Sequence, residues 1–119
     1  MGGEKQMEIR KFYETIGSDY KDVEKRMGSE KLVVHFVGRF MQDKTFASLS
    51  EAMEKNDGEA AFRAAHTLKG VCSNLGFDRL REASSELTEA LRHGSIDGSE
   101  ALFAIVKKEY EKVIGAWEG

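Results

Sequence analysis

The chain contains no proline in 119 residues, and this absence limits the folds open to it more than any other feature. Proline breaks helices, so a chain without it favours long helices joined by short turns. Apolar residues recur at intervals of three and four positions almost throughout, which is the spacing of one face of an α-helix. No segment alternates polar and apolar residues for long enough to be a β-strand. The sequence therefore predicts an all-α fold.

Glycines and capping residues divide the helical pattern into segments. Two short amphipathic stretches come first, at residues 9–16 and 20–27. Four longer ones follow, and we expect each to begin after an N-capping residue: Ser29, Asp57, Asp78 and Ser99. We expect a bend near Asp43 in the first, and a second helix over residues 58–75 that ends at Gly76. This order predicts an antiparallel up-down four-helix bundle, with the short N-terminal helices packed on one end.

Length and composition fit a single domain. Hydrophobic residues make up 40% of the chain, which is enough for one core. We see no internal repeat and no second domain boundary, so residues 7–119 are predicted to form the domain. Residues 1–6 are polar and contain glycine, and we expect them to be disordered or to be left over from expression.

Charge and cysteine content exclude several classes of protein. The chain has 18 Lys and Arg against 21 Asp and Glu, a net charge of −3, whereas nucleic-acid binders are usually basic. No apolar run approaches the roughly 20 residues of a membrane span, and the N-terminus lacks a signal-peptide pattern. The single cysteine, Cys72, excludes an intramolecular disulfide and fits a reducing compartment. We therefore expect a cytoplasmic protein that binds neither nucleic acid nor membranes.

The segment around His66 departs from the amphipathic pattern. At about 100° per residue, one stripe must face the core: Ala61, Ala65, Leu68, Cys72 and Leu75. His66 lies roughly 160° from Leu68 on the same wheel, so it is expected to face solvent. The residues within about 60° of it provide a carboxylate, an aromatic ring, a cation, a missing side chain and a hydroxyl: Glu59, Phe62, Lys69, Gly70 and Ser73.

Several of these neighbours would be useful at a phosphorylated histidine. A free imidazole has a pKa near ~6.5, so an exposed histidine keeps a nitrogen lone pair for attack on phosphorus. A phosphoryl group brings about two negative charges, and Lys69, one turn along, can place its ammonium beside them. Glycine within a helix is about 1 kcal/mol worse than alanine. At Gly70, however, it leaves open the space that a side chain four positions after His66 would cover.

The remaining histidines indicate no metal or catalytic site. No two of the three histidines share metal-ligand spacing, and the chain has no Cys/His cluster. We expect His35 to be partly buried or at an edge, His93 to complement a helix dipole, and Cys72 to be a core residue. No catalytic Ser/His/Asp or Cys/His arrangement is evident. The sequence thus predicts no bound cofactor or metal.

The motif His66-Thr67-Leu68-Lys69-Gly70, followed by Asn74-Leu75-Gly76, resembles the signature of histidine-containing phosphotransfer (HPt) domains. The resemblance extends from the helix after Ser29 to the last helix. It implies a four-helix bundle whose exposed histidine accepts a phosphoryl group from a receiver-domain aspartate and passes it to another. It implies that His66 is the phosphorylated residue, that Lys69 steadies the phosphoryl oxygens and that Gly70 gives access to the imidazole. It also implies that three residues contribute to receiver docking: Phe62, Arg63 and Ser73.

The resemblance also implies the partners, which are response-regulator receiver domains, a hybrid sensor kinase or both. The Mg²⁺ of the transfer reaction would be bound by the receiver domain only, and the family favours a monomer. We expect a phosphocarrier and not an enzyme, because the chain lacks a Gly-rich phosphate loop and has no room for an ATP-binding domain.

Three alternatives stay open. The chain could be a phosphoacceptor domain from a chemotaxis-type or hybrid sensor kinase, in which case a kinase domain would phosphorylate His66. It could be the dimerisation helices of a sensor kinase, but Thr67 stands where those proteins usually have an acidic residue, and four helices are more than they use. It could also be a helical interaction scaffold that is never phosphorylated.

Overall fold

The structure is a computed structural model that describes residues 2–119, with side chains from Glu8 onwards. The described residues form seven helices and no strand: α1 (Gly2–Thr15), α2 (Tyr20–Met27), α3 (Glu30–Phe40), α4 (Thr45–Glu54), α5 (Gly58–Leu75), α6 (Asp78–Ala90) and α7 (Glu100–Glu118). The predicted all-α class is confirmed. Of the segment 1–6, Met1 lies outside the described residues, and α1 begins at Gly2.

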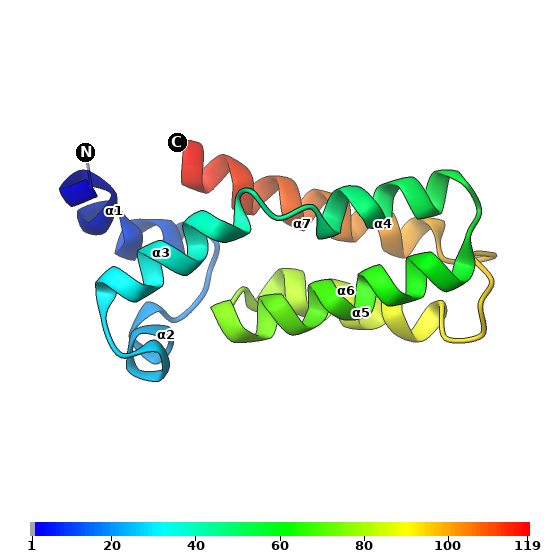
Figure 1. Cartoon of the computed structure of the whole chain (residues 1–119), viewed down its shortest axis with the longest axis horizontal. Helices are drawn as coiled ribbons and strands as arrows, with labels where there is room; N and C mark the ends of the chain where they lie inside the picture. The colour runs from blue at the N-terminus through cyan, green and yellow to red at the C-terminus, as the bar shows by residue number, and fades with distance from the viewer. Residues whose placement is uncertain (1) are drawn as a thin grey trace.

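Helices α4 to α7 form the bundle, and α1 to α3 gather at one end of it (Figure 1). α5 packs against α4 on one side and α6 on the other, and α6 packs against α7. The Phe46 ring of α4 closes the bundle by stacking on Tyr110 of α7, with 4.1 Å between centroids. This is the predicted up-down bundle with the N-terminal helices on one end.

The expected bend near Asp43 is a complete break between two helices. α3 ends at Phe40, and α4 begins at Thr45. The carboxylate of Asp43 accepts a 2.7 Å hydrogen bond from the Thr45 backbone N–H, which satisfies one of the free donors at the start of α4. As a result, α3 belongs to the end of the molecule, and the first helix of the bundle is shorter than the sequence predicts.

The boundaries of α5 agree with the sequence prediction. Asp57 caps α5 through a hydrogen bond from the Ala60 N–H to its carboxylate, and Ser29 caps α3 in the same way. Gly76 has a φ of 71°, and its Cβ would clash with Val23 of α2. Only glycine can therefore both end α5 and allow the close approach of α2.

One predicted cap is wrong, and another has the predicted position but forms no capping hydrogen bond. Asp78 is the first residue of α6, and its backbone N–H donates to the hydroxyl of Ser18 from the loop after α1. Ser99 stands at the N-cap position of α7, but its hydroxyl donates to the Ile96 carbonyl. At Asp78 the backbone N–H pairs with Ser18, a residue far away in the sequence. At Ser99 the hydroxyl pairs with the carbonyl three residues earlier instead of capping α7.

The core continues from the bundle into the N-terminal helices. The Phe77 ring, which is buried between α5 and α6, meets Phe12, Tyr13 and Phe40 edge-on or tilted. The hydroxyl of Tyr13 donates a 2.7 Å hydrogen bond to the Leu75 carbonyl at the end of α5. These contacts hold the C-terminal end of α5 in place, so the helix that carries His66 is anchored at that end.

Candidate functional site

The core stripe of α5 faces inward as predicted. Its five members are at most 4% exposed: Ala61, Ala65, Leu68, Cys72 and Leu75. His66 is exposed on the opposite face. The orientation derived from the helical spacing is therefore confirmed.

The ring of Phe62, one turn earlier, lies beside the imidazole of His66. The two rings are 12° from parallel with 6.2 Å between centroids. Phe62 is half-buried. The Arg92 guanidinium also lies near its ring, 5.6 Å from the ring centre. An aromatic ring thus borders the histidine on the N-terminal side of the helix.

The C-terminal side of His66 is open. Gly70, one turn further on, is exposed, and a Cβ there would meet no atom within 4 Å. Close packing therefore does not explain this glycine. Ser73, a further turn along, is also exposed and small, so Lys69 is the one long side chain among the three residues that the sequence places on this side of the imidazole.

Lys69 is half-buried on the side of α5 that faces α6. Its positive charge contributes to lowering the pKa of Glu89 on α6, although the larger cause is a hydrogen bond from Arg92. The ammonium of Lys69 therefore lies in a region that already contains a carboxylate and a second cation.

Sequence reasoning missed Glu89 and Arg92. Arg92 Nε donates a 2.7 Å hydrogen bond to Glu89 Oε2. The two residues lie on α6 and in the turn after it, and no local motif marks them. The short turn between α5 and α6 indicates that the two helices are antiparallel neighbours, but not which face α6 turns towards His66.

Two open hollows flank the N-terminal half of α5, and Arg63 lines both of them. One, of about 400 Å³, lies between α4 and α5 and has basic and hydroxyl groups in its walls: Lys44, Thr45, Ser48, Arg63 and Thr67. The other, of about 440 Å³, lies beside the turn after α6 and has further basic groups and one carboxylate in its walls: Glu59, Arg63, Arg92 and His93. Basic side chains therefore outnumber carboxylates in the walls of these two hollows.

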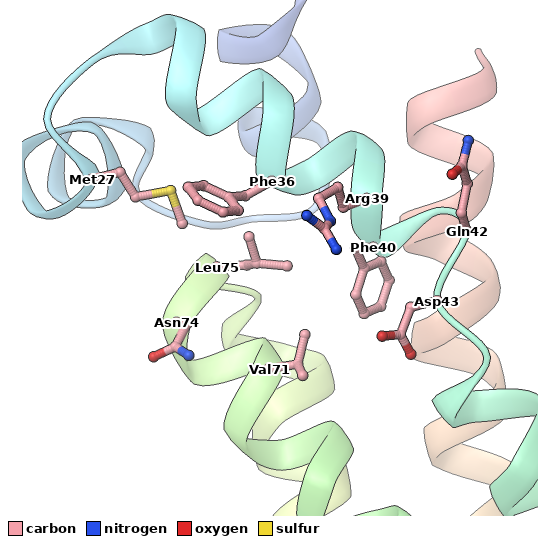
Figure 2. Close-up of a pocket in the computed structure, with 9 residues that line it drawn as sticks. All are labelled: Met27, Phe36, Arg39, Phe40, Gln42, Asp43, Val71, Asn74 and Leu75. Atoms are coloured by element: carbon pink, nitrogen blue, oxygen red, sulfur yellow. The ribbon is translucent and has the colours of Figure 1, made fainter.

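A larger groove, of about 560 Å³, lies where α5 meets the N-terminal helices (Figure 2). Figure 2 shows Phe36 and Phe40 of α3 on one wall and Val71, Asn74 and Leu75 of α5 on the other. Phe36 is 42% exposed. Phe36 belongs to an apolar helical stripe with Val33, Val37 and Phe40, a pattern that predicts burial, so the sequence gives no sign of this groove.

Of the other histidines, His35 lies on α3 and His93 lines the hollow beside the turn after α6. His35 is exposed, so the expected partial burial is wrong, although its ring lies 5.2 Å from that of Phe36. His93 is exposed in the turn after α6. Cys72 is buried as expected, and desolvation raises the pKa of its thiol to about 12. Within the described residues, no three His, Cys, Asp or Glu side chains form a group that could hold a metal ion.

Fold and site together define a class of protein: a small helical bundle with an accessible histidine in the middle of one helix. The sequence profile of the Hpt domain family matches residues 39–116, which is more than half of the chain. The chain therefore belongs to the Hpt domain family, whose members are phosphotransfer domains of two-component signalling. Comparison with curated proteins and with solved structures gives no match.

The family match begins at the last two residues of α3 and ends at residue 116 in α7, so it leaves α1, α2 and most of α3 outside. Within residues 2–119, no helix has the length and the apolar character of a membrane span.

Proposed function

We propose that this domain carries a phosphoryl group on His66 between the aspartates of two receiver domains. The observation that carries the proposal is the outward imidazole of His66 next to a glycine, Gly70, which no packing contact requires. A glycine at that place costs helix stability, and open access to the imidazole explains it.

In the proposed step, a lone pair of the His66 imidazole attacks the phosphorus of an aspartyl phosphate on the receiver. A nitrogen–phosphorus bond forms as the phosphorus–oxygen bond breaks, and the bonding electrons leave on the aspartate carboxylate. The reverse step delivers the group to the aspartate of a second receiver. Such a transfer needs mainly alignment and neutralisation of charge.

Lys69 supplies part of that neutralisation. It lies one turn from His66, on the side of α5 where its charge reaches Glu89 of α6. A charge-assisted hydrogen bond from its ammonium would stabilise the phosphoryl oxygens. The domain itself then needs no metal, and the Mg²⁺ of the reaction belongs to the acidic pocket of the receiver.

The receiver would dock over the His66 face. Phe62, Arg63 and Ser73 border the imidazole, and all three are at least partly exposed. The groove of Figure 2 extends this surface, because Asn74 in its wall directly follows Ser73 on α5. Asn74 is eight residues, or about 12 Å, beyond His66. A receiver domain is wide enough to cover both, and a helix with apolar residues would fit the groove.

We infer a phosphocarrier without kinase activity, working as a monomer in the cytoplasm. Hpt domains are phosphocarriers without kinase activity of their own, and the sequence shows no ATP-binding motif. Its partners would be response-regulator receivers or a hybrid kinase. A place within a larger kinase, chemotaxis-type or hybrid, is the second candidate, because the family match covers α4 to α7 and the same His66 chemistry would serve there.

Incubation with receivers of the source organism, charged with acetyl phosphate, tests the proposal. We expect label that is acid-labile and base-stable and that maps to His66. His66→Gln should abolish it, whereas His35→Gln and His93→Gln, the matched exposed histidines, should not. Label on another residue, or none from any receiver, would refute the carrier function and favour a scaffold. Label that appears only with a histidine kinase domain and ATP would favour the second candidate.

A further inference from the structure

A chain of contacts connects His66 to an ion pair that the proposed function does not use. The Arg92 guanidinium lies over the Phe62 ring, and the same ring is stacked beside the His66 imidazole. On its other side, Arg92 donates a 2.7 Å hydrogen bond to Glu89. A carboxylate thus holds a cation that is linked to the phosphorylation site through the Phe62 ring.

A carboxylate is unexpected at a site that must accept a dianion. The hydrogen bond from Arg92 holds the pKa of Glu89 below its ordinary value, and the charge of Lys69 lowers it further. Glu89 is therefore ionised, paired with Arg92 and within range of the charge of Lys69. A phosphoryl group on His66 would carry about two negative charges and would need the same two cations.

Stability of the fold does not account for the pair. The side chains of Arg92 and Glu89 are 56% and 62% exposed. Ion pairs with this exposure contribute little to folding, because water and salt screen them. For the same reason the pair is easily broken when a stronger anion appears next to it.

We propose that Glu89 competes with the phosphoryl group of His66 for Arg92 and Lys69, and so limits the stability of the phosphorylated state. This inference rests on the proposed function of His66. While His66 is unmodified, Glu89 pairs with Arg92. Once His66 is phosphorylated, the two cations are shared between two anions, and the remaining repulsion favours delivery of the phosphoryl group to a receiver.

Glu89 makes and breaks no bond in this scheme. During delivery, a carboxylate oxygen of the receiver aspartate forms a bond to phosphorus as the phosphorus–nitrogen bond breaks, and the bonding electrons return to the imidazole. Glu89 acts only through its charge, so it is a positioning residue for the two cations. Its removal should therefore change the phosphorylated state and leave the unmodified protein nearly unaffected.

Several other titratable groups lie on α5 or line the two hollows beside it and must be kept constant in the test: Glu59, Arg63 and Lys69 on α5, Lys44 before α4, and Arg92 and His93 after α6. Glu86 provides a matched control. It is exposed on the same helix, one turn before Glu89, and forms no ion pair with a described residue. Glu86→Gln removes the same charge without releasing Arg92.

The experiment measures the phosphoryl group itself. The whole protein is phosphorylated with phosphoramidate or with a charged receiver, and the ³¹P chemical shift of phospho-His66 is followed against pH. Glu89→Gln should lower the pKa of the phosphoryl group by about half a pH unit, because an anion is lost and two cations are released. It should also shift the transfer equilibrium about threefold towards phospho-His66. Arg92→Gln should move both quantities in the opposite direction.

Equal shifts for Glu89→Gln and Glu86→Gln, or no shift for either, would overturn the inference while leaving the carrier function intact. Failure of both phosphoramidate and charged receivers to label His66 would overturn both. Melting temperatures of the unmodified variants within about 2 °C of the parent would show that the changes concern the phosphorylated state.

Discussion

The rings of Phe62 and His66 lie 12° from parallel and 6.2 Å apart between centroids, one turn from each other on α5. Within the described residues, no hydrogen bond holds the imidazole in addition to this contact. An offset ring pair contributes at most about 1.5 kcal/mol beyond the area it buries. The His66 imidazole is therefore oriented by its contact with the Phe62 ring and not by a network of hydrogen bonds. A partner can approach it without breaking hydrogen bonds.

His66→Gln should accordingly leave the fold almost unchanged. The side chain is exposed and has only the Phe62 contact to lose, so we expect less than about 1 kcal/mol of destabilisation. Circular dichroism and urea unfolding measure this directly. Phosphorylation should be lost completely in the same variant. A large loss of stability would show that the imidazole has a structural role.

Gly70→Leu should have opposite effects on the stability of α5 and on access to the His66 imidazole. A Cβ at this exposed helical position meets no atom within 4 Å, and leucine has a better helix propensity than glycine, so the free energy of unfolding should rise by up to about 1 kcal/mol. Transfer from a charged receiver should nevertheless slow by at least about tenfold, a barrier of roughly 1.4 kcal/mol, because the side chain covers the imidazole.

Gly115 provides the control for this change. It too is exposed within a helix, α7, with no atom within 4 Å of its missing Cβ. Gly115→Leu should stabilise the helix in the same way and leave transfer unaffected. If Gly70→Leu transferred at the parental rate, open access would no longer explain the glycine.

Most of the fold could be predicted because the helices are built from local signals. The Asp57 cap and Gly76 at the end fix α5 to the residue, since both act through hydrogen bonds or dihedral angles within the segment. The break between α3 and α4 was only partly predicted. The caps expected from Asp78 and Ser99 failed for a different reason, because Ser18 and Ile96 provide partners that a local pattern does not show.

The candidate site also has features that local signals predict and features that depend on packing. The outward direction of His66 follows from the helical period alone, and the structure confirms it. The contact between Phe62 and Arg92 depends on how α6 is rotated about its axis, which packing decides. The exposure of Phe36 could not be predicted either, since an apolar stripe predicts burial whether or not another helix covers it.

Lys69→Ala should destabilise the phosphorylated state more than it weakens receiver binding. The variant loses the ammonium nearest the phosphoryl oxygens, so we expect the transfer equilibrium to move about threefold to tenfold towards the receiver. Lys107→Ala, which removes an exposed lysine of α7, is the control. Equal losses in receiver affinity and in the transfer equilibrium would indicate that Lys69 only docks the partner.

Phe36→Ala should weaken receiver binding without altering the chemical step. The ring lines the groove in Figure 2 and is 42% exposed, so its truncation removes apolar contact area that a docked receiver would bury. We expect the KM for the charged receiver to rise roughly fivefold to twentyfold with little change in kcat. Ile105→Ala removes a similarly exposed apolar side chain from α7 and should change neither constant. Unchanged KM in Phe36→Ala would exclude the groove from the docking surface.

Cys72 should make the stability of the bundle fall as the pH rises in the alkaline range. Burial raises the pKa of its thiol from 9.0 to about 12, so the folded state keeps a proton that the unfolded chain loses above pH 9. Stability is then fully present below pH 9 and falls as the pH rises from 9 towards 12. Relative to Cys72→Ala, the free energy of unfolding should fall by about 1 kcal/mol between pH 9 and pH 10. Urea unfolding of both proteins at the two pH values measures the difference, in which the other titrating groups cancel. Parallel pH dependences would mean that the thiol ionises as readily in the folded protein as in the unfolded chain.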